Sequence, residues 1–234
     1  MVPRAMCSNL LLMVTGVAAH SSPGCGAEPP LWPGTRQRLA IEVPDALAAS
    51  GWATRNYWLC LPAAYQANKP SMLLLDFHGF YDNAKREQRE DHVADFVDQF
   101  GLNVITVYPH GSGDGWSGDS HGWNVEGNGL NTEPGPSGHV CRTPRRAGDG
   151  WNDVYECYNS CYNTKRGCDK QWGCNFASCM DDQAFVKRML QHLSRTLCLD
   201  LDHVHVTGIS AGGLMAYQVP RALPRPPVTC RDRP

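Results

Sequence analysis

Two apolar runs on either side of a helix-length segment constrain the fold of this chain most strongly. Ser71–Phe77 (SMLLLDF) and Asn103–Pro109 (NVITVYP) are short, continuous apolar stretches of the kind found in strands covered on both faces. From Asn83 to Phe100, apolar residues recur at the i, i+3, i+4 and i+7 positions of one helix, and Gly101 supplies its stop. Those positions are Val93, Phe96, Val97 and Phe100. Strand, helix and strand at this spacing predict a right-handed crossover, and hence an α/β protein with a mainly parallel sheet.

Further strands and a second helix fit the same class. Strands are expected at Leu39–Val43 (LAIEV), Asn56–Pro62 (NYWLCLP) and His203–Gly208 (HVHVTG), because apolar and aromatic residues alternate or concentrate there. Asp181 and Asp182 favour a helix start, since carboxylates complement the positive end of the helix dipole. The apolar face of that helix is Phe185, Val186, Met189, Leu190, Leu193 and Leu197.

Size and charge limit the classes of partner. A chain of 234 residues suits one α/β domain with a substantial core. The net charge is −2, so nucleic acid and anionic membrane surfaces are not the expected partners. A neutral or mixed substrate is expected instead. The composition does not indicate an oligomeric state.

The first residues have the pattern of a secretory signal. Arg4 precedes an apolar run, Leu10–Ala19, that is too short to span a bilayer and is followed by small residues. Residues 1–19 are therefore predicted to be a signal peptide, and the mature protein is expected to be secreted and free of the membrane. A buried N-terminal helix is the alternative.

Cysteine usage agrees with an extracellular protein. Of eleven cysteines, Cys7 would leave with the signal, and six of the other ten crowd between Cys141 and Cys179. Disulfides are expected, with a connectivity that the sequence does not give. Zinc is the alternative, although this segment lacks C-x2-C pairs and histidine. The long stretch at about 110–179 is accordingly predicted to be a disulfide-rich insertion. It is either functional or only a surface loop that disulfides hold in place.

A candidate nucleophile lies near the end of the last predicted strand. Gly208–Gly212 (GISAG) matches G-x-S-x-G, with a strand pattern before it and a helix-forming stretch, AGGLMAYQV, after it. Glycines on both sides of Ser210 would allow the sharp turn that exposes a serine hydroxyl. Ser210 is therefore the predicted catalytic residue.

A second motif supplies candidate oxyanion donors. DFHGFYDN (Asp76–Asn83) has a His-Gly pair at the end of a buried strand, at the place where serine hydrolases put one backbone N–H of the oxyanion hole. The other donor is the N–H after the nucleophile, because both must face the charge that develops on the carbonyl oxygen. The predicted donors are Phe80 and Ala211. His78 is predicted to orient this loop rather than to act as the base.

Six segments between about Arg55 and Tyr217 carry a family resemblance. They are RNYWLCLPAAY, LLLDFHG, NVITVYPHG, the Trp-Asn of GWNVEG, DDQAFVKRMLQHL and VHVTGISAGGLMAY. In this order they resemble the secreted α/β-hydrolase esterases that group poly(3-hydroxybutyrate) depolymerases with feruloyl and acetylxylan esterases. The resemblance implies a three-layer α/β-hydrolase fold, with residues 20–219 as the N-terminal part of the domain. It also implies ester cleavage through an acyl-enzyme on Ser210, with no cofactor and no metal.

The sequence after Ser210 departs from that family. The triad of this fold runs Ser, then Asp or Glu, then His, yet only Asp232 and no histidine follow Ser210. Residues 220–234 form an atypical Pro/Arg-rich tail, and Pro220 is expected to end the preceding helix. We interpret this tail and the missing triad residues as the result of a misassigned reading frame, an unspliced segment or a truncated gene copy. A shortened functional variant is the alternative. The domain is thus expected to be incomplete at its C-terminus and poorly active, with HVHVT as an exposed edge strand.

The cysteine count also indicates that a part of the domain is missing. Nine cysteines remain once Cys7 and Cys230 are set aside, and a missing partner downstream would explain the odd number.

The leading hypothesis is a secreted serine esterase acting on polyesters or on plant cell-wall polysaccharide esters. Alternatives are a catalytically dead polymer-binding protein and an acyl-peptide serine hydrolase. Two lesser alternatives are a metal site at His203 and His205, and a substitute base at His110 or His121.

Overall fold

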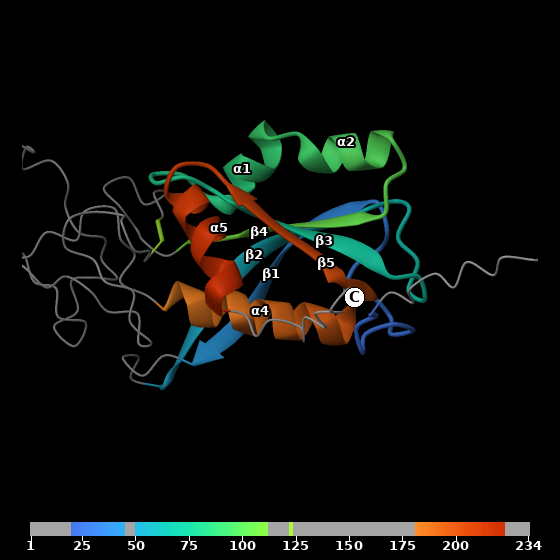
Figure 1. Cartoon of the computed structure of the whole chain (residues 1–234), viewed down its shortest axis with the longest axis horizontal. Helices are drawn as coiled ribbons and strands as arrows, with labels where there is room; N and C mark the ends of the chain where they lie inside the picture. Colours follow the sequence, from blue (N-terminus) through green and yellow to red (C-terminus); the bar gives the residue numbers. More distant parts are fainter. Residues whose placement is uncertain (1–19, 45–49, 112–121, 124–180, 223–234) are drawn as a thin grey trace, which may run out of the picture.

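The computed structural model describes residues 20–44, 50–111, 122–123 and 181–222. These residues form an α/β fold in which a five-stranded sheet has helices α1 and α2 on one face and helices α4 and α5 on the other (Figure 1). The elements are β1 (Thr35–Pro44), β2 (Trp52–Leu61), β3 (Ser71–Phe77), α1 (Ala84–Glu90), α2 (Val93–Gln99), β4 (Val104–Pro109), α4 (Asp182–Thr196), β5 (Leu199–Gly208) and α5 (Ala211–Ala222). The expected three layers are therefore present.

The sheet is mixed rather than mainly parallel. Its strand order is β1-β2-β4-β3-β5, and β3 pairs in parallel with both β4 and β5. Strand β2 is antiparallel to both of its neighbours, β1 and β4. The predicted crossover between β3 and β4 is confirmed. The expectation of a mainly parallel sheet fails at β1 and β2, because a connection as short as residues 45–51 cannot make the crossover that a parallel pair needs.

The segment between β3 and β4 forms two helices, not the single predicted helix. His92 has a left-handed backbone, with φ of 56°, and this separates α1 from α2. The buried residues of α2 are Ala94 and Val97, whereas Phe96 and Phe100 are 54% and 58% exposed. The apolar spacing located the helical segment but not its break, because a single left-handed residue leaves no mark in the hydrophobic pattern.

Helix α4 begins and packs as the sequence predicts. The Asp181 side chain accepts a hydrogen bond from the Ala184 N–H and caps the helix. The next residue, Asp182, is buried and pairs with the buried guanidinium of Arg55 on β2, at 2.5 Å. The same guanidinium lies over the Phe185 ring, 4.2 Å from its centroid. This buried pair joins α4 to β2 across the core.

One disulfide and one buried thiol lie among the described residues. Cys25 is bonded to Cys198, which ties the segment before β1 to the residue before β5. Cys60 is a free thiol in the core, and burial raises its pKa to about 12. The inference drawn from the odd number of cysteines stays a prediction, because most of the cysteines lie outside the described residues. The cluster from Cys141 to Cys179 lies outside the described residues, as do the predicted signal peptide and most of the insertion.

Helix α5 differs from its prediction at the C-terminal end. It continues to Ala222, two residues past Pro220, where the sequence predicted its end. A proline removes one backbone donor, and so close to the end of a helix this loss does not stop the last turn. Strand β5 is a terminal strand of the described sheet, and His203 and His205 on it are exposed.

Acidic side chains gather under α1 on the face opposite α4. Burial, together with the neighbouring carboxyls of Asp91 and Glu87, raises the pKa of Asp76, on β3, to about 7. Burial and the neighbouring acids Asp82 and Asp91 likewise raise the pKa of Glu87 to about 7. The folded protein therefore holds protons here that the unfolded chain releases near pH 4.

This proton uptake predicts that stability falls as pH rises. Because the folded pKa of Asp76 lies above its unfolded value of 3.8, its contribution is full below pH 4 and lost by about pH 7. We expect Asp76→Asn to remove about 2 kcal/mol or more of this decline in the free energy of unfolding, measured by urea denaturation between pH 4 and pH 8. The control Glu42→Gln, an exposed carboxylate of β1 that accepts a hydrogen bond from Thr54, should keep the wild-type slope. An unchanged slope in Asp76→Asn would contradict the assignment.

Candidate active site

Ser210 stands on a strained turn between β5 and α5. Strand β5 ends at Gly208 and α5 begins at Ala211, so only Ile209 and Ser210 connect them. The φ of Ser210 is 53°, a left-handed value that is costly for a residue with a side chain. Residue Ser210 is exposed. The predicted strand, turn and helix are confirmed, whereas the catalytic role of Ser210 stays a prediction.

The glycines on either side of Ser210 press against the end of β3. A Cβ added to Gly212 would overlap the Phe77 carbonyl oxygen and lie 2.5 Å from the His78 oxygen. A Cβ added to Gly208 would lie 2.6 Å from Gly212 backbone atoms and 2.7 Å from the same Phe77 oxygen. The turn is also bonded there, since the Ile209 N–H donates to the Phe77 oxygen at 3.1 Å. Only glycine fits at 208 and 212, so contact with β3 fixes the position of Ser210.

The loop after β3 lies directly beside the serine. A Cβ added to Gly79 would be 3.6 Å from the Ser210 Cβ and 3.5 Å from the Ile209 Cγ2. The predicted donor N–H of Phe80 belongs to the peptide bond that follows Gly79, so it is within one residue of this contact. The other predicted donor, Ala211, is buried and is the first residue of α5. Its N–H is among those that a helix leaves without an internal partner. The structure thus brings the three predicted site residues to the same end of the sheet, beyond the carboxyl ends of β3 and β5.

The His78 ring links two loops. It is fully buried, its Nδ1 lies 2.7 Å from the Gly79 oxygen, and its Nε2 accepts the Gly111 N–H at 3.0 Å. Because Nε2 accepts, Nδ1 carries the proton and donates to Gly79. Both ring nitrogens are therefore engaged, which agrees with the orienting role that the sequence analysis gave this residue. The loop bearing Gly79 is held to the end of β4 in this way.

Trp123 is a site residue to which sequence reasoning gave no role of its own. Its Nε1–H donates to the His78 oxygen at 2.8 Å, and its ring packs edge-on against Phe77, with centroids 5.3 Å apart. Trp123 is fully buried. A tryptophan in a glycine-rich stretch, 45 residues from its partner, gives no spacing signal that predicts this contact. It fixes the carbonyl that precedes Gly79.

The other histidines are placed as follows. The Nδ1 of His110 accepts the Ala84 N–H at 3.3 Å, and its ring centroid lies 6.1 Å from that of His78. His203 contacts Asp200 through Nδ1 at 2.8 Å, and its ring is 6.3 Å from that of His205. In the described ranges, no group of three or more His, Cys, Asp or Glu side chains could hold a metal ion. His121 lies outside those ranges.

The part of the chain that is described contains an α/β fold with an exposed, strained serine at one edge of its sheet. No helix in it is long and apolar enough to cross a membrane. No protein-family model matches the chain, and no curated protein sequence does.

Two solved structures are similar at a low level. One is described as a ferulic acid esterase, with a TM-score of 0.42 and 16% identity, covering 80% of this chain and 54% of its own. The other is an S-formylglutathione hydrolase from Agrobacterium tumefaciens, with a TM-score of 0.42 and 8% identity, covering 81% and 54%. This chain thus spans about half the length of each. A likeness at this level establishes no family for the chain.

The packing of the turn predicts a sharp difference between two neighbouring glycines. Gly212→Ala should lower the free energy of unfolding by about 3 kcal/mol or more, because the new Cβ would overlap backbone that cannot yield. Gly213→Ala is the matched control, since its Cβ would meet the Gly208 oxygen at 3.2 Å and alanine favours the helix. We expect that variant to stay within about 1 kcal/mol of wild type in urea denaturation. Equal stabilities of the two variants would contradict the packing.

Proposed function

We propose that the protein is a serine ester hydrolase with Ser210 as its nucleophile. In the reaction, Oγ attacks the ester carbonyl carbon, its proton passes to a base, and the alcohol departs to leave an acyl-enzyme. Water then attacks the same carbon and releases the acid and the serine. The observation that carries the proposal is the exposed residue Ser210 on a left-handed backbone, beside the Gly79 loop.

The N–H groups of Phe80 and Ala211 are proposed to stabilise the oxyanion. Both belong to backbone that is held in place before substrate binds: the first by His78 and Trp123, the second by the glycine contacts with β3. Preorganised donors of this kind cost no reorganisation during the reaction. The positive end of the α5 dipole adds to the field at the same place.

His78 lies in the loop beside Ser210, but it is not available as the base. Both of its ring nitrogens are engaged, one with the Gly79 oxygen and the other with the Gly111 N–H. Loss of the histidine from a comparable triad lowers turnover by roughly 10⁶, although the oxyanion hole and substrate binding still contribute about 10³. An added diffusible base such as imidazole is therefore proposed to accelerate the reaction of Ser210.

Substrate and location are proposed from the sequence motifs. The esters would be polyesters or plant cell-wall polysaccharide esters carrying feruloyl, acetyl or hydroxybutyrate groups. Secretion is proposed from the N-terminal pattern of residues 1–19 and is supported by the Cys25–Cys198 disulfide, since such bonds persist mainly in oxidising compartments.

A fluorophosphonate probe tests the nucleophile directly. We expect slow labelling of the protein at Ser210, which imidazole, as a diffusible base, accelerates by roughly 10²-fold. Mass spectrometry of the peptides locates the adduct. Ser210→Ala should abolish the labelling, and Ser50→Ala, which removes an ordinary exposed turn serine, should leave it unchanged.

Two results would contradict the proposal. One is labelling that persists in Ser210→Ala, because the probe would then have reacted elsewhere. The other is no labelling of folded wild-type protein at any imidazole concentration. If that protein still binds an insoluble polyester, the catalytically dead binding protein becomes the better description.

A further inference from the structure

A second candidate site lies at the end of the sheet opposite to Ser210. Strand β1 starts at Thr35, which pairs with Leu61 at the end of β2. The neighbouring Cys60 pairs with Thr106, near the amino end of β4. Ser210, in contrast, follows the carboxyl end of β5, which runs in the same direction as β4. Anything that binds near the start of β1 is therefore separate from the proposed esterase site.

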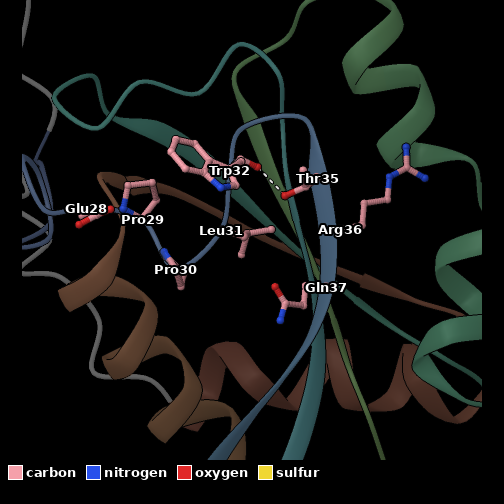
Figure 2. A pocket seen from close by; sticks show the side chains of 8 residues that line it. All are labelled: Glu28, Pro29, Pro30, Leu31, Trp32, Thr35, Arg36 and Gln37. Carbon is pink, nitrogen blue, oxygen red and sulfur yellow. Dashed lines mark hydrogen bonds between the residues drawn. The ribbon is translucent and has the colours of Figure 1, made fainter.

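A surface hollow of about 540 Å³ is found there, which we call the Trp32 hollow. Pro29, Pro30 and Leu31 give it an apolar side. Trp32 and Gln37 line it as well, and Figure 2 shows the Leu31 side chain between them. Its volume is in the range of about 300–1,000 Å³ that is usual for small-molecule sites.

The indole of Trp32 is held out of the core by a rigid backbone. It is 79% exposed, although tryptophan is among the residues that gain most from burial. The Thr35 hydroxyl donates to the Trp32 oxygen at 2.5 Å (Figure 2), and the Thr35 N–H donates to it at 3.2 Å. The Gly34 N–H donates to Leu61 at the end of β2, at 2.8 Å. The exposed ring therefore belongs to a turn whose backbone is hydrogen-bonded at several positions.

The polar groups of the hollow suit an uncharged ligand. Glu28 and Gln37 line the hollow and are both exposed, so the Glu28 carboxylate and the Gln37 side-chain amide are open to a ligand. The one cation, Arg36, is paired with Asp95 at 2.5 Å and Asp98 at 3.8 Å, and Figure 2 shows it directed away from Trp32. An anion would thus meet a carboxylate and no available cation. A neutral ligand would find an acceptor, an amide and an aromatic face.

From this combination we infer that the Trp32 hollow binds a neutral sugar ring. A pyranose has one face of C–H groups, which packs on a flat aromatic ring, and a rim of hydroxyls that both donate and accept hydrogen bonds. Trp32 supplies the aromatic face, while Glu28 and Gln37 supply partners for the rim. A lipid tail would leave these polar groups without partners, which is costly. The site would hold a carbohydrate chain at a distance from Ser210, and it does not depend on esterase activity.

Isothermal titration calorimetry with cellohexaose, a neutral chain of pyranoses, tests the inference, and hexagalacturonate serves as the acidic comparison. We expect cellohexaose to bind with a Kd near or below about 1 mM and hexagalacturonate to bind at least tenfold more weakly. Trp32→Ala should weaken cellohexaose binding at least tenfold, and Gln37→Ala should weaken it by a smaller factor. Ser210→Ala should bind as wild type does, so the outcome is independent of the proposed catalysis.

Trp52→Ala is the matched control, because Trp52 is another exposed tryptophan, at 47%, at the start of β2 and outside the hollow. It should bind cellohexaose as wild type does. Unchanged melting temperatures would show that both tryptophan variants fold. The inference is overturned if wild type binds no cellohexaose, if Trp32→Ala binds it as well as wild type, or if Trp52→Ala loses binding equally. Tighter binding of hexagalacturonate would overturn the neutral-ligand assignment.

Discussion

The structure around Ser210 depends on a contact between two stretches of backbone. The turn from Gly208 to Gly212 lies so close to the end of β3 that neither glycine has room for a side chain. This contact keeps Ser210 in a left-handed conformation that an isolated peptide would rarely adopt. It also sets the Gly79 loop beside the serine. The strain at one residue is therefore maintained by packing at its neighbours, as is common where a fold presents a reactive group.

Much of the α/β architecture follows from short-range pattern. Strands β3 and β4 and helix α4 are predictable because each has an apolar run or face that the sequence displays directly. The split between α1 and α2 is not, since it depends on the backbone of His92 alone. The mixed sheet is a matter of how distant strands associate, which the hydrophobic pattern does not record.

In the candidate site, too, some features follow from the local sequence and others from tertiary contacts. The turn at Ser210 is predictable because its glycines form a local motif with one steric meaning. The bond from Trp123 to His78 is not, because the two residues are distant in sequence and the contact is tertiary. The raised pKa of Asp76 is likewise a product of packing, since burial and its acidic neighbours cause it. Local sequence thus located the serine, and tertiary contacts determine what holds it.

We propose that the Ser210 hydroxyl and the N–H groups of Phe80 and Ala211 face one common point. A crystal structure of the protein after reaction with diethyl p-nitrophenyl phosphate in the presence of imidazole would test it. We predict phosphorus bonded to the Ser210 Oγ, with the phosphoryl oxygen about 2.7–3.1 Å from both amide nitrogens. A phosphoryl oxygen turned into solvent, or an amide directed away from it, would contradict the account.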